Sequence, residues 1–373
     1  MKILVINFEY PPVGGGASPV GEEVAIQLYM MGNQVDVITM AYGLLPQYEE
    51  RNGIKIHRIE SGRKLPNMSR LVEHLKFLYG ARKFLKTHLK NNNYDVVHAH
   101  FFISSGVLAY WLWKYHKIPY IITPHGSDLP GYNPDHFKWM HLFTPRLIRL
   151  LILNCQFVIS PSKYLGNLVI PLLKNDNDKL KIIPYGITLP EPSPQDKKNI
   201  ILSTGRLLRR KGFHWLIEAV SSIDIGYELH IAGDGPMMSE LKELASRSKT
   251  RVVLHGWLDN KSKKYHDLLR KAKIYSLVSS SENVPVSLLE AMSYNCAVIT
   301  SDETGCAELV ADAGVLIPAN NLEVLKSTIS DLVQDEDRII ELGKRAQKRV
   351  KDHYVWSKVG LSYKEVLEEA CQK

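Results

Sequence analysis

The sequence lacks any long hydrophobic run, and this absence excludes whole classes of protein. Although 45% of the 373 residues are hydrophobic, there is no apolar stretch of about 18 residues, the length that a membrane-spanning helix requires. The longest apolar run, 150–159, is interrupted by Asn154 and Gln156. The N-terminal segment also lacks the charged-then-apolar pattern of a signal peptide. We therefore expect a cytoplasmic protein, either free or peripheral at the inner face of the cell membrane.

Cysteine is scarce. The four cysteines are Cys155, Cys296, Cys306 and Cys371. Their spacing matches no metal-binding motif. Three of them lie in apolar surroundings, where a reduced thiol behaves as a small hydrophobic side chain.

Acidic residues are scarce in one half of the chain only. Residues 1–190 contain 21 Lys and Arg against 13 Asp and Glu, whereas residues 191–373 contain 26 of each. The whole net charge of +8 therefore belongs to the first half. We expect that half to meet a large anionic partner.

Short apolar segments alternate with helix-period segments in two successive blocks. This pattern predicts an α/β protein with parallel sheets covered on both faces. The blocks are separated by a Pro-rich polar segment at 181–199. We expect two doubly wound, Rossmann-like domains, 1–185 and 186–354, hinged near 184–196 and followed by a helix at 355–373. In such folds ligands bind at the carboxyl ends of the strands.

Three consecutive glycines, Gly14, Gly15 and Gly16, follow the first predicted strand. Their loop is expected at the carboxyl edge of the sheet, where bare backbone can approach a phosphate or a sugar. The spacing is not Gly-x-Gly-x-x-Gly, and the second predicted strand does not end in an acidic residue. The dinucleotide-binding fingerprint is therefore absent. A flexible turn is the alternative interpretation.

Two glutamates, Glu282 and Glu290, flank the predicted start of a helix in "ENVPVSLLE". Asn283 and Pro285 are typical of a helix start, which places Glu282 on the preceding loop and Glu290 more than one turn inside the helix. A helix N-terminus favours a diphosphate, and carboxylates accept hydrogen bonds from sugar hydroxyls. The alternative is a pair of solvated surface glutamates.

The Glu-x7-Glu spacing, together with "STGRLLRRKG", "AGDGP" and "TPHGSD", resembles the retaining glycosyltransferases of family 4 over nearly the whole chain. The resemblance implies the GT-B fold, in which two Rossmann-like domains face each other across a cleft and a C-terminal helix, here 355–373, crosses back to the first domain. It implies transfer of a sugar from a UDP- or GDP-sugar donor to an acceptor. No cofactor, no metal and no nucleic-acid partner is expected, and no Asp-x-Asp motif lies at a predicted strand end.

The resemblance also assigns roles to residues of the second half. Arg206 and Lys211 would clamp the donor diphosphate and stabilise the charge that develops on it. Glu282 would bind hydroxyls of the transferred sugar, and Glu290 would bind the nucleotide ribose. The other implied donor-binding residues are Gly15 and Gly16 of the first half, and Gly205, Gly233, Val284, Val286, Ser287 and Leu288 of the second.

Three features of the second half receive no role from the family pattern or differ from it. We interpret Arg209 and Arg210 as solvated neighbours of the clamp. The usual glycine-aromatic-glycine run after the first glutamate is replaced by residues 283–285, and Cys306 stands where the family more often has the second of two glycines. These departures leave the identity of the donor open.

In the first half, His125 ends a predicted strand and is followed by Gly126. The resemblance implies that this histidine contacts the transferred sugar, with Asp128 orienting it, whereas a buried structural histidine is the alternative. His98 and His100 are expected on opposite faces of their strand and thus unable to share a metal ion. The acceptor side is assigned to Gly14, His100 and Asp128.

Residues 69–90 read as a basic amphipathic helix. Its leucines fall on one stripe and its basic residues lie elsewhere: Leu71, Leu75, Leu78, Leu85 and Leu89, with Arg70, Lys76, Arg82, Lys83, Lys86 and Lys90. The segment 136–149 mixes Phe137, Trp139 and Phe143 with further basic residues. Such surfaces favour an anionic bilayer, so a lipid-linked or membrane-proximal glycan is the expected acceptor. Alternatively, these apolar side chains belong to the core.

Other classes of protein share the expected nucleotide site. A GT-B-fold epimerase of nucleotide sugars would need acid and base groups around the sugar. A non-catalytic nucleotide-sugar-binding protein would not need all four of Arg206, Lys211, Glu282 and Glu290. A glycosyltransferase with a soluble acceptor is the third alternative.

Overall fold

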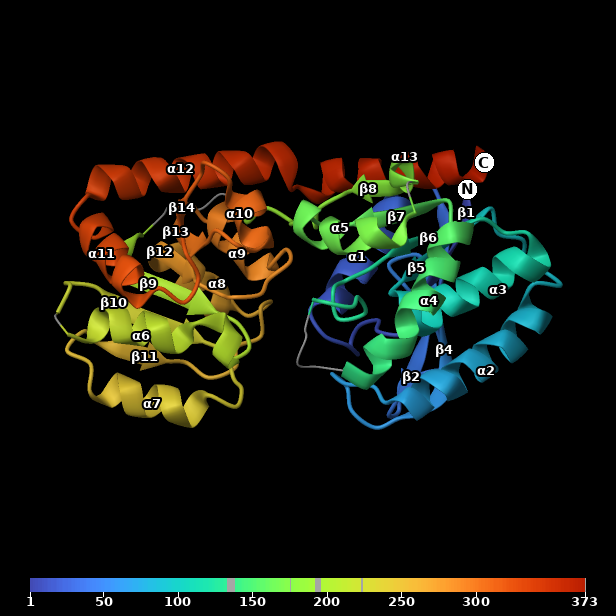
Figure 1. The fold of residues 1–373 in the computed structure, drawn as a ribbon, viewed down its shortest axis with the longest axis horizontal. Helices are drawn as coiled ribbons and strands as arrows, with labels where there is room; N and C mark the ends of the chain where they lie inside the picture. The colour runs from blue at the N-terminus through green and yellow to red at the C-terminus, as the bar shows by residue number, and fades with distance from the viewer. Residues whose placement is uncertain (133–137, 175, 192–195, 223, 373) are drawn as a thin grey trace. The chain divides into compact units, whose positions relative to one another are not determined.

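The computed structural model describes the backbone of residues 1–132, 138–174, 176–191, 196–222 and 224–372, with side chains from 144 onward in the second of these segments. The chain divides into two compact units (Figure 1). The first unit is Met1–Gly186 with Trp356–Lys373, and the second is Ile187–Val355. These boundaries lie one residue from those expected from the sequence.

The first unit is built on an eight-stranded sheet of order β3-β4-β2-β1-β5-β6-β7-β8. Its strands are β1 (Lys2–Ile6), β2 (Gln34–Tyr42), β3 (Tyr48–Arg51), β4 (Ile54–Arg63), β5 (Val96–His100), β6 (Tyr120–Thr123), β7 (Phe157–Ser160) and β8 (Leu180–Ile182). All neighbours are parallel except β3 and β4. Strands β5, β6 and β7 are buried at every position, because helices cover both faces of the sheet.

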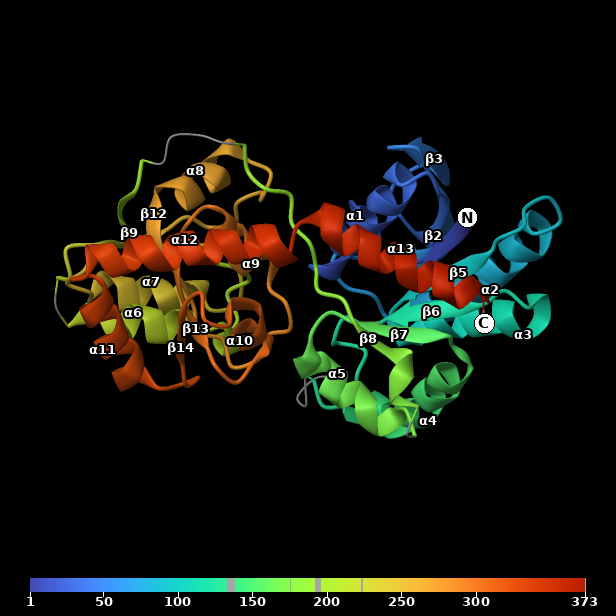
Figure 2. The ribbon, with the colours of Figure 1, turned by 90° about the horizontal axis from the view of Figure 1, so that it is seen from above.

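The helices of the first unit form two layers. They are α1 (Ala17–Met30), α2 (Leu71–His88), α3 (Val107–His116), α4 (Lys138–Asn154), α5 (Lys163–Val169) and α13 (Trp356–Gln372), with the short turns η1 (Phe102–Gly106), η2 (Ile170–Leu172) and η3 (Asn177–Lys179). Helices α2 to α5 share one core with the sheet. Helix α13 packs on α1, β5 and β6 (Figure 2), so the helix expected at 355–373 belongs to the first unit.

The second unit is built on a six-stranded sheet of order β11-β10-β9-β12-β13-β14, in which all neighbours are parallel. Its strands are β9 (Lys198–Thr204), β10 (Glu228–Ala232), β11 (Val252–Leu254), β12 (Ala272–Leu277), β13 (Ala297–Ser301) and β14 (Val315–Ile317). Every loop that leaves the carboxyl end of a strand therefore emerges at the same edge. This edge is where the candidate donor residues collect.

Helices again cover both faces of this second sheet. They are α6 (Phe213–Ser221), α7 (Met238–Ser246), α8 (Lys263–Lys271), α9 (Val286–Ser293), α10 (Gly305–Val310), α11 (Leu322–Leu332) and α12 (Glu336–His353), with the turn η4 (Arg209–Lys211). Helices α6, α7 and α11 share one core, while α8 and α9 pack on β9, β12 and β13. Among the described helices of both units, none is long and apolar enough to cross a membrane.

Candidate functional site

The centre of the candidate site in the second unit is an ion pair between two neighbouring loops. Lys211 lies in η4, which follows β9, and its Nζ contacts Glu282 Oε1 on the loop after β12. Both side chains are largely buried, with 14% and 10% exposure. A cation and a carboxylate are therefore held together at the carboxyl edge of the sheet.

The three arginines of the same loop differ in their surroundings. Arg206 is exposed, and no carboxylate of the described residues pairs with it. Arg209 is 71% exposed and pairs with Glu240, as expected of a solvated neighbour. Arg210 is not simply solvated, because its Nη1 donates to the Ser281 carbonyl at 2.7 Å and lies 3.9 Å from Glu282 Oε1.

The glycines of this edge allow two loops to pack backbone against backbone. Gly205 and Gly233 both have positive φ, and a Cβ on Gly233 would lie 1.8 Å from the Gly205 carbonyl oxygen. Gly212, with φ +74°, would place a Cβ 2.4 Å from the Val278 carbonyl oxygen. Glycine is therefore required at these positions by the loops themselves.

Glu290 lies on α9, in the second turn, and is half-buried against a tyrosine. The Tyr265 hydroxyl donates to Glu290 Oε2 at 2.5 Å. Burial raises the pKa of Glu290 to about 7, although the bond from Tyr265 acts in the opposite direction. Burial also raises the pKa of Tyr265, so its hydroxyl remains a donor. Tyr265, on α8, has no motif in the sequence that would have marked it.

The remaining donor positions surround the start of α9. Pro285 caps the helix, Val284 is buried, and Val286 and Ser287 are half-buried in the first turn. The Leu288 side chain is fully buried in the unit. Leu288 can therefore reach a ligand only through its backbone.

Two segments in which this sequence departs from the family pattern, 283–285 and 305–306, pack against each other. Gly305 N–H donates to the Glu282 carbonyl at 3.0 Å, and a Cβ on Gly305 would lie 1.8 Å from the Asn283 carbonyl oxygen. Cys306, the next residue, is fully buried, and burial together with the charge of Glu282 raises the pKa of its thiol to about 11. The segment that packs against the Glu282 loop thus contributes a buried thiol that is uncharged.

In the first unit, His125 lies at the centre of a network of rings. Its Nδ1 is hydrogen-bonded to the Tyr185 hydroxyl at 2.7 Å, and its Nε2 is hydrogen-bonded to His100 Nδ1 at 3.0 Å. The two imidazoles stack with centroids 5.2 Å apart. Burial lowers the pKa of both histidines, to about 3 for His100. Both rings are therefore neutral, and Tyr185 is a contact that the sequence did not indicate.

Asp128 holds the loop rather than the imidazole. Its Oδ1 accepts from the backbone N–H groups of His125 and Gly126, and its Oδ2 accepts from Phe102 N–H at 2.9 Å. Asp128 is 8% exposed. Asp128 thus fixes the backbone of His125, whereas Tyr185 and His100 hold its ring. The expected orienting of the histidine by Asp128 acts through the backbone alone.

The expectation that His98 and His100 face opposite sides is wrong. Their ring centroids are 4.3 Å apart, because residues two apart on a strand point to the same face. His98 Nε2 is hydrogen-bonded to Thr123 Oγ1 at 2.8 Å. His98 is therefore a core residue, whereas His100 belongs to the His125 network.

The three glycines of the first loop are not equivalent. Gly14, with φ +119°, would place a Cβ 2.6 Å from Ser18 Cβ, so the chain itself requires glycine there. Gly15 N–H donates to Glu9 Oε2 at 3.0 Å. A Cβ on Gly16 would meet nothing within 4 Å. Only Gly15 and Gly16 are thus free of crowding by the loop.

Helix α2 exposes apolar side chains that the sequence assigned to one leucine stripe. Phe77, Ala81 and Leu85 face the core. In contrast, the first half of the helix exposes Leu71, Val72, Leu75 and Tyr79 by 58 to 75%, and we call these four residues the α2 patch. Its second half exposes Arg82, Lys83 and Lys86. Phe137 lies outside the described residues, as do the side chains of Trp139 and Phe143.

Two family models together match nearly the whole chain. The model described as Glycosyltransferase Family 4 matches residues 14–190, and the model described as Glycosyl transferases group 1 matches residues 188–349. The chain belongs to the family 4 glycosyltransferases. The strand orders and the two-unit organisation agree with the GT-B fold of this family.

Relatives of this glycosyltransferase match most of its length. An uncharacterized glycosyltransferase of Methanocaldococcus jannaschii is 27% identical, with 96% of each chain covered. A Bacillus subtilis glycosyltransferase named for teichuronic acid biosynthesis is 27% identical over 83% of each chain.

Solved structures show the same fold. The sucrose-phosphate synthase of Thermosynechococcus elongatus has a TM-score of 0.81 at 20% identity, covering 99% of this chain and 98% of the other. The Anabaena protein HepE, solved in complex with UDP-glucose, has a TM-score of 0.75 at 19% identity, covering 99% of this chain and 100% of the other.

Proposed function

We propose that this glycosyltransferase moves a sugar from a UDP-sugar donor, with retention of anomeric configuration, to a lipid-linked glycan at an anionic membrane surface. The observation that carries the proposal is the contact of Lys211 with Glu282, on a loop that also carries Arg206, whose exposed side chain has no carboxylate partner among the described residues. A departing nucleoside diphosphate gains negative charge in the transition state, and fixed cations stabilise that charge. A carboxylate in contact with the cation can in turn accept bonds from sugar hydroxyls.

The proposed donor rests on the carboxylates of Glu282 and Glu290 and on one solved structure of the same fold. Glu290, held by Tyr265, is proposed to bind the ribose hydroxyls, and Glu282 to bind the transferred sugar. The structure of Anabaena HepE with UDP-glucose supports uridine as the nucleoside. The replacement of the family's glycines by Asn283, Val284 and Pro285 affects the side of the site proposed for the sugar.

Retention is proposed because Asp128, on the same loop as His125, already accepts hydrogen bonds at both carboxylate oxygens. This residue is therefore poorly placed to serve as a nucleophile or general base. The leaving phosphate oxygen would instead take the acceptor proton on the face it leaves. The neutral His125 would donate a hydrogen bond to the transferred sugar by giving up its present bond to His100 or Tyr185, and no metal would be required because Arg206 and Lys211 supply the positive charge.

The acceptor is assigned from the surface of α2. The α2 patch offers apolar side chains of a kind that enter a lipid interface, and Lys76, Arg82, Lys83 and Lys86 lie exposed on the same helix. Each basic residue close to an anionic surface contributes about 1 kcal/mol. The Bacillus subtilis relative named for teichuronic acid biosynthesis supports a cell-surface glycan as the product.

The donor and the stereochemistry are tested by incubating the protein with UDP- and GDP-sugars. We expect slow hydrolysis of one UDP-sugar to UDP without acceptor, and an NMR spectrum of the transfer product with the anomeric configuration of the donor. An inverted product would contradict retention. Interconversion of two nucleotide sugars without release of nucleoside diphosphate would identify an epimerase, and binding without turnover would identify a non-catalytic protein.

The acceptor class is tested by sedimentation with vesicles of anionic lipid. Binding should fall sharply as salt rises, because the attraction is screened within about 8 Å at physiological ionic strength. Replacing Lys76, Arg82, Lys83 and Lys86 together by Ser should abolish sedimentation and leave donor hydrolysis intact. The matched control replaces four exposed basic residues of α12: Arg338, Lys344, Lys348 and Lys351.

The control variant should sediment as the parent does. If the α2 variant also sediments, or if the parent ignores anionic vesicles at low salt, the membrane assignment fails and a soluble glycan becomes the acceptor.

A further inference from the structure

Three potential metal ligands lie together in the first unit, away from His125. Asp36 is near the start of β2, His57 is in the first half of β4, and His88 ends α2. Ile38 pairs with His57 in the β2–β4 register. Because residues two apart on a strand share a face, Asp36 and His57 point to the same side of the sheet, which α2 covers.

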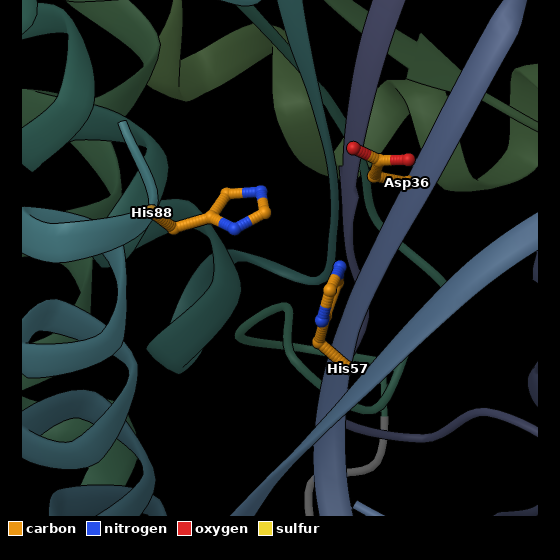
Figure 3. A group of neighbouring side chains, drawn as sticks. All are labelled: Asp36, His57 and His88. Carbon is orange, nitrogen blue, oxygen red and sulfur yellow. The ribbon is translucent and has the colours of Figure 1, made fainter. Parts of the chain in front are cut away.

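The three side chains converge. One donor atom of each lies within 4.8 Å of the donor atoms of the other two. The rings of His57 and His88 are 5.0 Å apart at 65°. Figure 3 shows both imidazoles and the Asp36 carboxylate directed into the same space between α2 and the sheet.

The hydrogen bonds of the cluster leave donor atoms available. The Tyr94 hydroxyl donates to Asp36 Oδ2 at 2.5 Å and lies 2.8 Å from His88 Nε2. His57 Nε2 is buried and has no hydrogen-bond partner among the described residues. Burial lowers the pKa of His57 to about 4 and also lowers that of His88. Both rings are thus neutral, which is the state that binds a metal.

We propose that Asp36, His57 and His88 bind a zinc ion. Two imidazole nitrogens and one carboxylate oxygen form a set that zinc takes readily, with bonds of about 2.0–2.2 Å and a water molecule as the fourth ligand of a tetrahedral site. Such bonds place donor atoms roughly 3.3–3.5 Å apart, so the side chains must close up from the present spacing. His57 loses no hydrogen bond in doing so, and Tyr94 would steady the carboxylate from outside, as second-layer partners of zinc ligands do.

The position of the cluster assigns it a structural role. It lies towards the amino ends of β2 and β4, whereas the glycine loop and His125 follow the carboxyl ends of β1 and β6. A metal ion there would tie the last turn of α2 to two strands. It would thereby steady the helix that carries the α2 patch.

Positive charges near the cluster limit its affinity. Lys55 lies close enough to lower the pKa of both His57 and His88, and Lys2 also lowers that of His88. Lys2 Nζ is engaged by Asn92 Oδ1 at 2.8 Å. Lys55 is exposed, and replacing it by Gln should tighten zinc binding.

The test uses the full chain without a histidine tag, after treatment with a chelator. Titration with Co²⁺ should give the intense visible absorption of a tetrahedral site, saturating at one ion per chain and reversed by Zn²⁺. His57→Gln and His88→Gln should each weaken binding by about tenfold or more. Zn²⁺ should raise the thermal unfolding temperature of the parent and not that of either variant.

A matched control comes from a second histidine pair. His230 and His255, on β10 and just after β11, are joined at 3.1 Å and have ring centroids 5.0 Å apart. The double variant His230→Gln/His255→Gln should retain the Co²⁺ spectrum. Absence of a tetrahedral spectrum in the parent, or loss of it in the control but not in His57→Gln, would overturn the proposal. Circular dichroism and UDP binding check that each variant is folded.

Discussion

The candidate site of the second unit holds its charges in direct contact, whereas that of the first unit consists of neutral, buried rings. Lys211 contacts Glu282, and Arg206 is exposed on the loop that carries Lys211. His100 and His125, in contrast, are stacked and uncharged, and the carboxylate of Asp128, on the loop of His125, accepts backbone N–H groups. We propose that the two sites bind different kinds of ligand.

This difference supports the proposed division of substrates between the two units. A diphosphate carries a charge that grows as the bond breaks, and only fixed cations follow that change. A sugar hydroxyl is neutral throughout, and a buried neutral imidazole can bond to it without the cost of burying a charge. The surface charge has the opposite distribution, since the excess of basic residues belongs to the first half of the chain. We attribute that excess to contact with a membrane rather than to catalysis.

The largest effect should come from removing the fixed cations. Lys211→Ala and Arg206→Ala should each lower kcat by about a hundredfold or more, because a charge facing the leaving diphosphate is lost. Arg209→Ala, which removes an exposed neighbour, should change kcat by less than about twofold. Thermal unfolding checks the fold, and unchanged kcat in both test variants would remove this loop from the site.

Removing the central ring of the first unit should be the next largest effect. His125→Ala should lower kcat by about tenfold to a hundredfold, the range expected for a lost hydrogen bond in the transition state together with looser sugar positioning. Calorimetry should show UDP affinity unchanged, because the proposed nucleotide contacts belong to the second unit. A loss of UDP affinity similar to that of Glu290→Gln would contradict the assignment of nucleotide binding to the second unit.

The strands that the sequence predicted are the ones with continuous apolar runs. Strands β3, β8 and β14 are not among the apolar segments that we take for strands in the sequence, and each is short and lies at an edge of its sheet. Edge strands are half-solvated, so their sequences do not have to be apolar, while β14, with the apolar sequence VLI, is too short to show a period. β3, with the sequence YEER, shows this most plainly.

The site residues that the sequence predicted are those in motifs at the carboxyl ends of strands. Tyr185, Tyr265 and Arg210 were missed, or taken for solvated, because their roles depend on partners that only the fold brings near. Tyr265 and Glu290, for example, belong to different helices. The mistaken view of His98 and His100 came from misapplying the strand period, which places residues two apart on the same face.

The pH dependence of nucleotide binding should separate the two glutamates. Burial raises the pKa of Glu290 to about 7, so the carboxyl is mostly protonated below that pH and accepts ribose hydroxyls fully only above it. UDP affinity should therefore rise through about pH 7 in the parent, and Glu290→Gln should lack this rise. Glu282→Gln should retain it and impair use of the sugar instead. Equal loss of UDP affinity in both variants would contradict the assignment.

The same shift in pKa has a consequence for stability. An ordinary carboxyl titrates near 4.5 in the unfolded chain, so between about pH 4.5 and 7 the folded state holds a proton that the unfolded state has lost. The free energy of unfolding should thus fall over that window because of Glu290 and level off above it. Glu290→Gln should remove this fall, which chemical denaturation at several pH values would measure.

The smallest expected effects come from removing one tyrosine hydroxyl in each unit, and they distinguish the two sites most sharply. Tyr185→Phe removes the 2.7 Å bond to His125, and Tyr265→Phe removes the 2.5 Å bond to Glu290. A single hydrogen bond contributes about 0.5–1.5 kcal/mol, which corresponds to a change of roughly twofold to tenfold. Tyr185→Phe should lower kcat within that range without changing UDP affinity, since the His125 ring keeps its contact with His100.

Tyr265→Phe should act differently because its partner titrates. The lost donor favoured the ionised carboxylate, so the pKa of Glu290 should rise further and the increase in UDP affinity should move to higher pH. At a pH well above the new pKa, Tyr265→Phe should bind UDP nearly as the parent does, whereas Tyr185→Phe should keep its reduced kcat at every pH. If both variants showed the same pH-independent loss, the contrast between a charged second site and a neutral first site would be refuted.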